Sequence, residues 1–224
     1  MDIKAKLHAL TDAGYAAFQR RLIPNIPPEM IIGVRTPELR KLAKELIKSG
    51  EADGFIASLP HDSFEENQLH AFIINACRDF GECVVNIERF LPYVDNWAIC
   101  DALLPRVFAK HRGELISHIE KWLRSEHEYT LRFGIGMLMK HCLGEDYRPN
   151  YPEMVAEIRS DAYYVNMMRA WYFAEALTLR YDEILPCIEE GRLDRWTHNM
   201  AIRKSCESFR VPPEHKAYLR GLRR

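Results

Sequence analysis

Apolar residues recur along the chain at the three-to-four-residue spacing of helices. After Ser63, for example, Leu69, Phe72, Ile73 and Ala76 fall on one face of a helix. No segment shows sustained alternation of apolar and polar residues bounded by hairpin turns, which is the pattern of a half-buried strand. The pattern therefore predicts an all-α protein.

Signals for helix ends agree with this interpretation. Thr36 is expected to cap a helix that has Pro37 in its first turn, and Gly50 is expected to end that helix. Ser63 and Glu66 have the spacing of a capping box. Each signal places a helix start or stop beside an apolar run of helical period.

The later part of the chain continues the pattern. Asn96 is expected to cap a helix, and Pro105 lies within a helical pattern, where we expect it to produce a kink. Further helices are predicted over residues 130–143, 162–180, 194–209 and 213–222. The helices come in pairs that recur roughly every 35 to 45 residues, as in HEAT-like repeats.

No linker is long enough to separate domains. The sequence therefore predicts one domain over residues 1–224, an α-α superhelix of HEAT/ARM-like helical hairpin repeats. Stacked hairpins bury one face against their neighbours and expose the other as a concave surface.

Composition limits the class of protein. With 224 residues, 47% of them hydrophobic, the chain can bury a large core. It has no apolar run of the length of a membrane span, and charged residues interrupt its first ten positions, unlike a secretory signal. The 6 cysteines include no CxxC pair, which favours reduced thiols and a cytoplasmic location. No seam for symmetric association is visible, so we expect a monomer.

Charge is unevenly distributed. The net charge is −1, yet the last 24 residues hold seven basic and two acidic side chains. This basic end either fits a polyanionic partner or is a solvated helix end with favourable dipole placement.

Trp97 precedes Asp101 by one helical turn, so the indole and the carboxylate share a helix face. Both groups attract cations, and together they could form a pocket for a positively charged group. The alternative is a core tryptophan beside an aspartate that faces solvent or pairs with Arg106.

Two further segments are candidates. Arg132 and Lys140 share a helix face with Gly136 between them, which would let a phosphate approach the backbone; the alternative is a core helix from which the arginine reaches outward. The aromatic run at residues 163–171 is, taken alone, more typical of a core. His141 and Cys142 are adjacent and so point to different faces, and His111 fits a helix end, so no metal site is predicted.

Several motifs in order resemble the AlkD-type DNA alkylation repair family. They are Gly33-Val34-Arg35-Thr36-Pro37-Glu38-Leu39-Arg40, Asp95-Asn96-Trp97 with Asp101, Leu131-Arg132-Phe133-Gly134-Ile135, Tyr163-Tyr164-Val165-Asn166-Met167 with Ala170-Trp171, and the segment at 199–210. The resemblance spans nearly the whole chain.

The resemblance implies a DNA glycosylase that acts on duplex DNA carrying N3- or N7-alkylated purines, without metal or organic cofactor and without deep base flipping. It implies that Trp97 and Asp101 line the lesion, that Arg132 holds the backbone nearby and that Trp171 packs against the deoxyribose. The predicted DNA-binding residues are Arg132, Lys140, Arg203 and Lys204.

The chemistry of these residues suits that role. An alkylated purine is cationic and leaves as a neutral base, while the sugar passes through an oxocarbenium-like state that the Asp101 carboxylate can stabilise. The predicted catalytic residues are Asp101, Trp97 and Trp171. The alternative is a non-catalytic repeat module that binds DNA or protein.

Overall fold

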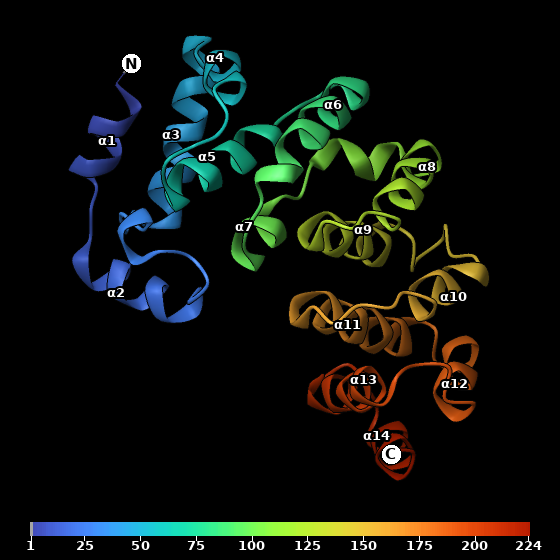
Figure 1. Ribbon diagram of the computed structural model, residues 1–224. Coiled ribbons are helices and arrows are strands. Elements are labelled where there is room, and N and C mark those ends of the chain that lie inside the picture. The colour runs from blue at the N-terminus through green and yellow to red at the C-terminus, as the bar shows by residue number, and fades with distance from the viewer. Residues whose placement is uncertain (1) are drawn as a thin grey trace. The chain divides into compact units, whose positions relative to one another are not determined.

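The computed structural model describes residues 2–224, and these residues form a chain of helices (Figure 1). Within this range there is no β-strand, only an isolated antiparallel bridge between Thr11 and Val34. No helix in this range is both long and apolar enough to cross a membrane. The predicted all-α class is confirmed.

The chain divides into two compact units, with the boundary between Lys110 and His111. The first contains α1 (Ile3–Ala9), α2 (Ala13–Leu22), η1 (Pro28–Met30), α3 (Thr36–Ser49), α4 (Ala52–Ala57), α5 (Phe64–Ile74), α6 (Phe80–Phe90), η2 (Leu91–Tyr93), α7 (Trp97–Ala102) and η3 (Arg106–Lys110). The second contains α8 (Arg112–Trp122), α9 (Glu128–His141), α10 (Asn150–Ala156), α11 (Tyr163–Leu179), α12 (Tyr181–Glu189), α13 (Arg195–Glu207) and α14 (Pro213–Gly221). The single domain expected from the sequence stays a prediction.

Helix α5 is the centre of the first unit, and every one of its residues is buried. Helices α3, α4 and α7 all contact it. The apolar core beside it includes Leu7, Leu39, Leu42, Leu46, Phe55, Leu69 and Phe72. A helix buried on all sides must satisfy its polar side chains internally.

Glu65 on α5 does so by holding the loop before α3. Its carboxylate accepts hydrogen bonds from the main-chain nitrogens of Ile32 at 2.9 Å, Gly33 at 2.6 Å and Val34 at 3.3 Å. Gly33 has a φ of 95°, and a Cβ there would lie 2.6 Å from the Cβ of Ala16. The loop therefore needs glycine at this position and a buried acceptor beside it.

In the second unit, α9, α11 and α13 lie side by side in that order (Figure 1). Helix α8 packs on α9, α12 on α11 and α14 on α13. The largest fully buried apolar side chains of this unit are Phe133, Tyr172 and Phe173. Each helix thus buries one face against its neighbours.

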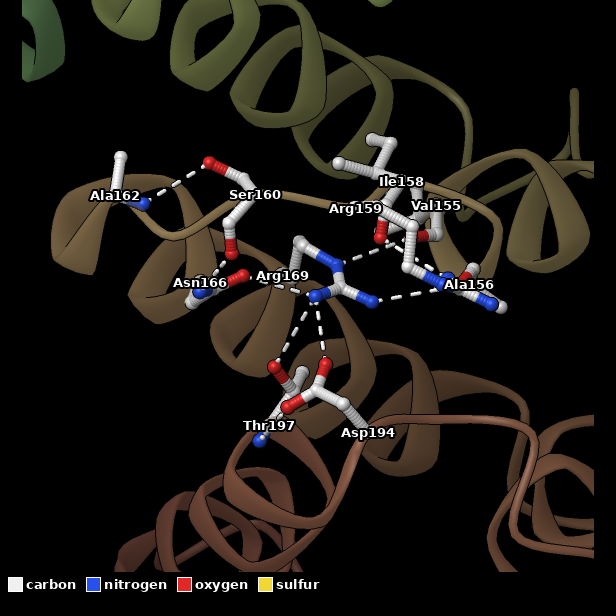
Figure 2. A network of polar contacts seen from close by, with 10 residues as sticks. All are labelled: Val155, Ala156, Ile158, Arg159, Ser160, Ala162, Asn166, Arg169, Asp194 and Thr197. Carbon is white, nitrogen blue, oxygen red and sulfur yellow. Dashed lines mark hydrogen bonds and ion pairs between the residues drawn. The ribbon is translucent and has the colours of Figure 1, made fainter.

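A buried arginine connects three helices of this unit (Figure 2). The Arg169 side chain on α11 is 1% exposed and forms an ion pair with Asp194 at 2.7 Å. Its guanidinium also donates hydrogen bonds to the main-chain oxygens of Val155 and Ala156 and to the side chains of Asn166 and Thr197. Since Asp194 also caps α13 by accepting from the main-chain nitrogen of Thr197, the network fixes the start of α13.

Three predicted helix ends are confirmed. Ser63 caps α5, and the Glu66 carboxylate accepts a hydrogen bond from the Ser63 hydroxyl at 2.9 Å. Asn96 caps α7 by accepting from the main-chain nitrogen of Ile99 at 3.0 Å. Helix α3 ends at Ser49, and Gly50, with a φ of 76°, is its C-cap.

The predicted role of Thr36 is wrong. Thr36 is the first residue of α3, and Arg35 occupies the capping position without a side-chain capping bond. The Thr36 hydroxyl instead lies 3.4 Å from the Tyr15 hydroxyl. Here a tertiary contact replaces the local cap.

The kink predicted at Pro105 is also absent. Helix α7 ends at Ala102, and Pro105 lies in the connection to η3. Proline lacks an N–H and crowds the residue before it, so the helix stops ahead of it. Pro186, by contrast, lies inside α12.

Candidate functional site

Helix α7 carries Trp97 at its first position and Asp101 at its fifth. Ile99 and Cys100 are buried, whereas Trp97 and Asp101 are both half-buried. At about 1.5 Å of rise per residue, the two residues lie about one turn apart on the accessible side of the helix. The structure therefore brings these two predicted site residues together.

The start of α7 is fixed to the end of α2. The indole Nε1 of Trp97 donates a hydrogen bond to the main-chain oxygen of Leu22 at 3.2 Å. The Asn25 side chain donates to the main-chain oxygen of Asp95 at 2.8 Å. Because the indole N–H is engaged, the ring face is the part of Trp97 left for a ligand.

The Asn75 side chain fixes the end of α7. Asn75 donates from Nδ2 to the main-chain oxygen of Ala102 at 2.7 Å, and its Oδ1 accepts from the main-chain nitrogen of Leu104 at 2.6 Å. A helix of six residues is too short to be stable alone. The contacts at its two ends therefore define where Trp97 and Asp101 lie.

In the second unit, Arg132 and Trp171 lie against each other. The Arg132 side chain comes from α9 and its Cζ is 5.6 Å from the centroid of the Trp171 ring. Its Nη1 donates to the main-chain oxygen of Tyr164 at 2.6 Å. Arg132 is only 1% exposed and Trp171 is 36% exposed, so the arginine supports the inner side of an accessible indole.

Lys140 is exposed at the end of α9, as a cation that binds phosphate should be. Gly136 between Arg132 and Lys140 is half-buried, and a Cβ there would lie 3.7 Å from the Met168 Cε of α11. That separation is an ordinary packing distance. Gly136 therefore faces the neighbouring helix as well as the surface.

Arg203 and Lys204 on α13 share one acidic partner. The Arg203 Nε lies 2.9 Å from one carboxylate oxygen of Glu207, and the Lys204 Nζ lies 3.0 Å from the other. The two cations lower the pKa of Glu207, Lys204 more than Arg203. Glu207 thus balances one of the two positive charges of Arg203 and Lys204.

The sequence analysis treated Tyr163 as part of a run more typical of a core and did not single out Trp196, but both side chains are exposed. Tyr163 is 56% exposed and Trp196 is 40% exposed, and their rings meet edge to face with centroids 5.8 Å apart. The available signal was position: each residue stands within the first two positions of its helix, ahead of the helix's buried stretch.

The predicted site residues are divided between the two units. Trp97 and Asp101 belong to the first unit, and Arg132, Lys140, Trp171, Arg203 and Lys204 belong to the second. Within residues 2–224, no group of three or more His, Cys, Asp or Glu side chains has an arrangement that could hold a metal ion.

Comparison with known proteins identifies the family. Residues 3–159 match the family described as DNA alkylation repair enzyme. The matched region includes Trp97, Asp101 and Arg132, whereas Trp171 follows it. No curated protein matches the chain. Because the match covers well over half of the 224 residues, the chain belongs to the DNA alkylation repair enzyme family.

Proposed function

We propose that the protein is a DNA glycosylase that hydrolyses the N-glycosidic bond of N3- and N7-alkylated purines in duplex DNA. Its family membership supports an enzymatic role in the repair of alkylated DNA. The observation that carries the finer proposal is the accessible pair of Trp97 and Asp101 on a helix fixed at both ends.

The proposed chemistry begins with a base that already carries a positive charge. The bond between C1′ and the base nitrogen breaks, its electron pair goes to the purine, and the base leaves neutral. The deoxyribose becomes oxocarbenium-like, and a nearby carboxylate lowers the free energy of that cation. Asp101 has this role in the proposal, and it also orients the water whose oxygen adds to C1′ and accepts the proton that this water loses.

Trp97 would act through its ring face, since its N–H donates to the Leu22 oxygen. An indole face attracts cations, so it favours both the alkylated purine and the developing charge on the sugar. A fixed indole also needs little reorganisation when the substrate binds.

Trp171, which belongs to the second unit, is the proposed contact to the deoxyribose. Its partner Arg132 is only 1% exposed. Burial at this level favours a role in which Arg132 supports the indole over one in which it contacts a phosphate directly. The exposed Lys140, with Arg203 and Lys204, is the proposed contact to the DNA backbone.

The test is the release of free base from a duplex that contains 7-methylguanine. We expect Asp101→Asn to lower kcat about a hundredfold, since it removes the charge that faces the transition state. Asp53→Asn is a matched control, because Asp53 is an exposed helical aspartate of the same unit.

The result separates the two functions. Near wild-type turnover in Asp101→Asn would overturn the assignment of Asp101. DNA binding without base release by the unaltered protein would favour the non-catalytic repeat module instead.

A further inference from the structure

A basic cleft lies on the exposed face of α13. Its volume is about 570 Å³, and it is lined by Trp196, Asn199 and the four arginines Arg195, Arg203, Arg223 and Arg224. Apart from Arg203, none of these residues belongs to the predicted glycosylase site. The cleft lies wholly within the second unit.

The cleft is formed by one helix face and the segment after α14. Residues 195, 199 and 203 follow each other at four-residue spacing, so their side chains project from one side of α13. The Arg195 Nε and the Asn199 Nδ2 both donate to the main-chain oxygen of Arg224, at 3.1 Å and 2.6 Å. The Asn199 Oδ1 accepts from the main-chain nitrogen of Arg224 at 2.9 Å. These contacts hold Arg223 and Arg224 beside the helix.

The charge of the cleft suits an anion. In the part of the chain that the structure describes, no acidic side chain is among its lining residues. Glu207 pairs with Arg203 at the edge of the cleft, which leaves an excess of guanidinium groups. Guanidinium groups match the geometry of phosphate and can bind it through two hydrogen bonds.

Trp196 adds a flat aromatic surface to this charge. Its indole is 40% exposed and also lines a second cavity of about 470 Å³. Tyr163 packs against the indole with ring planes at 68°, and Asp194 two residues earlier is fixed by Arg169 (Figure 2). The indole therefore stands on a rigid helix start.

We infer that this cleft binds an unpaired nucleotide of single-stranded nucleic acid, with its phosphate on the arginines and its base stacked on Trp196. Bases inside a duplex are already stacked on both faces, so an indole placed beside a phosphate site can stack only on a base that has left the pair. Aromatic platforms beside a basic groove are the common means of binding single strands.

Fluorescence anisotropy with unmodified labelled (dT)8 and with a duplex of equal length tests the inference. We expect Trp196→Ala to weaken binding of (dT)8 about tenfold and Trp196→Phe to weaken it much less. Arg223→Gln should lower the affinity for (dT)8 and reduce the slope of log K against log salt by about 0.7. Phe209→Ala is the matched control, because Phe209 is fully exposed and outside the cleft.

The outcomes are separable from those of the proposed glycosylase, because (dT)8 contains no lesion and base release is measured apart. Unchanged (dT)8 affinity in a folded Trp196→Ala variant would overturn the inference. Equal loss of duplex and (dT)8 binding in that variant would also overturn it, and would make the cleft a duplex contact.

Discussion

The Arg132 guanidinium is a buried charge whose contacts are with its own protein. It donates to the Tyr164 oxygen of α11 and lies beneath the Trp171 ring, so it joins two helices and orients an accessible indole. A cation with 1% exposure reaches a DNA phosphate only after it moves. We therefore propose that Arg132 supports DNA binding indirectly, by orienting Trp171.

This role predicts how Arg132→Lys should behave. Lysine keeps the charge but loses the planar group that both stacks and donates, so we expect the free energy of unfolding to fall by about 2 kcal/mol. The fluorescence of Trp171 should change with it. Urea unfolding and fluorescence spectra measure both effects, and the exposed Lys140→Gln should leave stability within about 0.5 kcal/mol of the original.

A different result would assign Arg132 a direct contact with DNA. If Arg132→Lys weakened DNA binding while stability and indole fluorescence stayed unchanged, Arg132 would contact the DNA itself.

Residue spacing predicts which site residues share a helix face, but it does not predict contacts between helices. A four-residue interval on a helix places Trp97 and Asp101 on one face whatever surrounds them. The burial of Arg132 depends on a carbonyl 32 positions away on another helix, and no local pattern carries that information. The same limit applies to Glu65, whose partners lie in the loop before α3.

At the scale of elements, α7 is a short helix that is stabilised by contacts with other segments of the chain. Its start is fixed by Asn96, Asn25 and Leu22, and its end by Asn75. Capping side chains such as Asn96 can be recognised in the sequence because they act on their own helix. The contacts from Leu22, Asn25 and Asn75 cannot, because they depend on tertiary structure.

Asn75 therefore offers a test of the element. Asn75→Ala removes the donor to Ala102 and the acceptor for Leu104, and we expect it to lower the free energy of unfolding by about 2 kcal/mol. Because the end of α7 carries Asp101, kcat for base release should fall more than KM changes. Urea titration and steady-state kinetics measure the two effects.

Asn86→Ala on α6 is the matched control for Asn75→Ala, since Asn86 is half-buried on a neighbouring helix. Equal losses of stability in the two variants, with unchanged kcat in both, would contradict the proposal that Asn75 positions Asp101 by fixing the end of α7.

At the scale of the molecule, each unit buries polar groups that the all-helical pattern alone does not reveal. The first unit holds a histidine pair, in which the His70 Nδ1 lies 2.8 Å from the His61 Nε2, and the His70 ring stacks on Phe90 at 4.0 Å. The second holds the Arg169 network (Figure 2). The sequence predicted the class of fold from period and caps, yet these interior contacts join segments that are distant along the chain.

Two histidines, the buried His70 and the half-buried His141, predict that the protein loses stability in acid. Burial, with a smaller contribution from the charge of His61, lowers the pKa of His70 to about 3. Burial, with the charges of Arg112 and Lys140, lowers that of His141 to about 4. At these two histidines the unfolded chain therefore binds more protons than the folded one below pH 6.5. Their contribution to the free energy of unfolding is complete above that pH and falls as the pH is lowered toward these pKa values. Each histidine contributes at most about 1.4 kcal/mol per pH unit.

Urea unfolding between pH 4 and 8 should show this decline in the free energy of unfolding. His70→Gln should make the decline with falling pH shallower, whereas the exposed His8→Gln should not. An unchanged slope in His70→Gln would mean that its ring takes up a proton without loss of the fold.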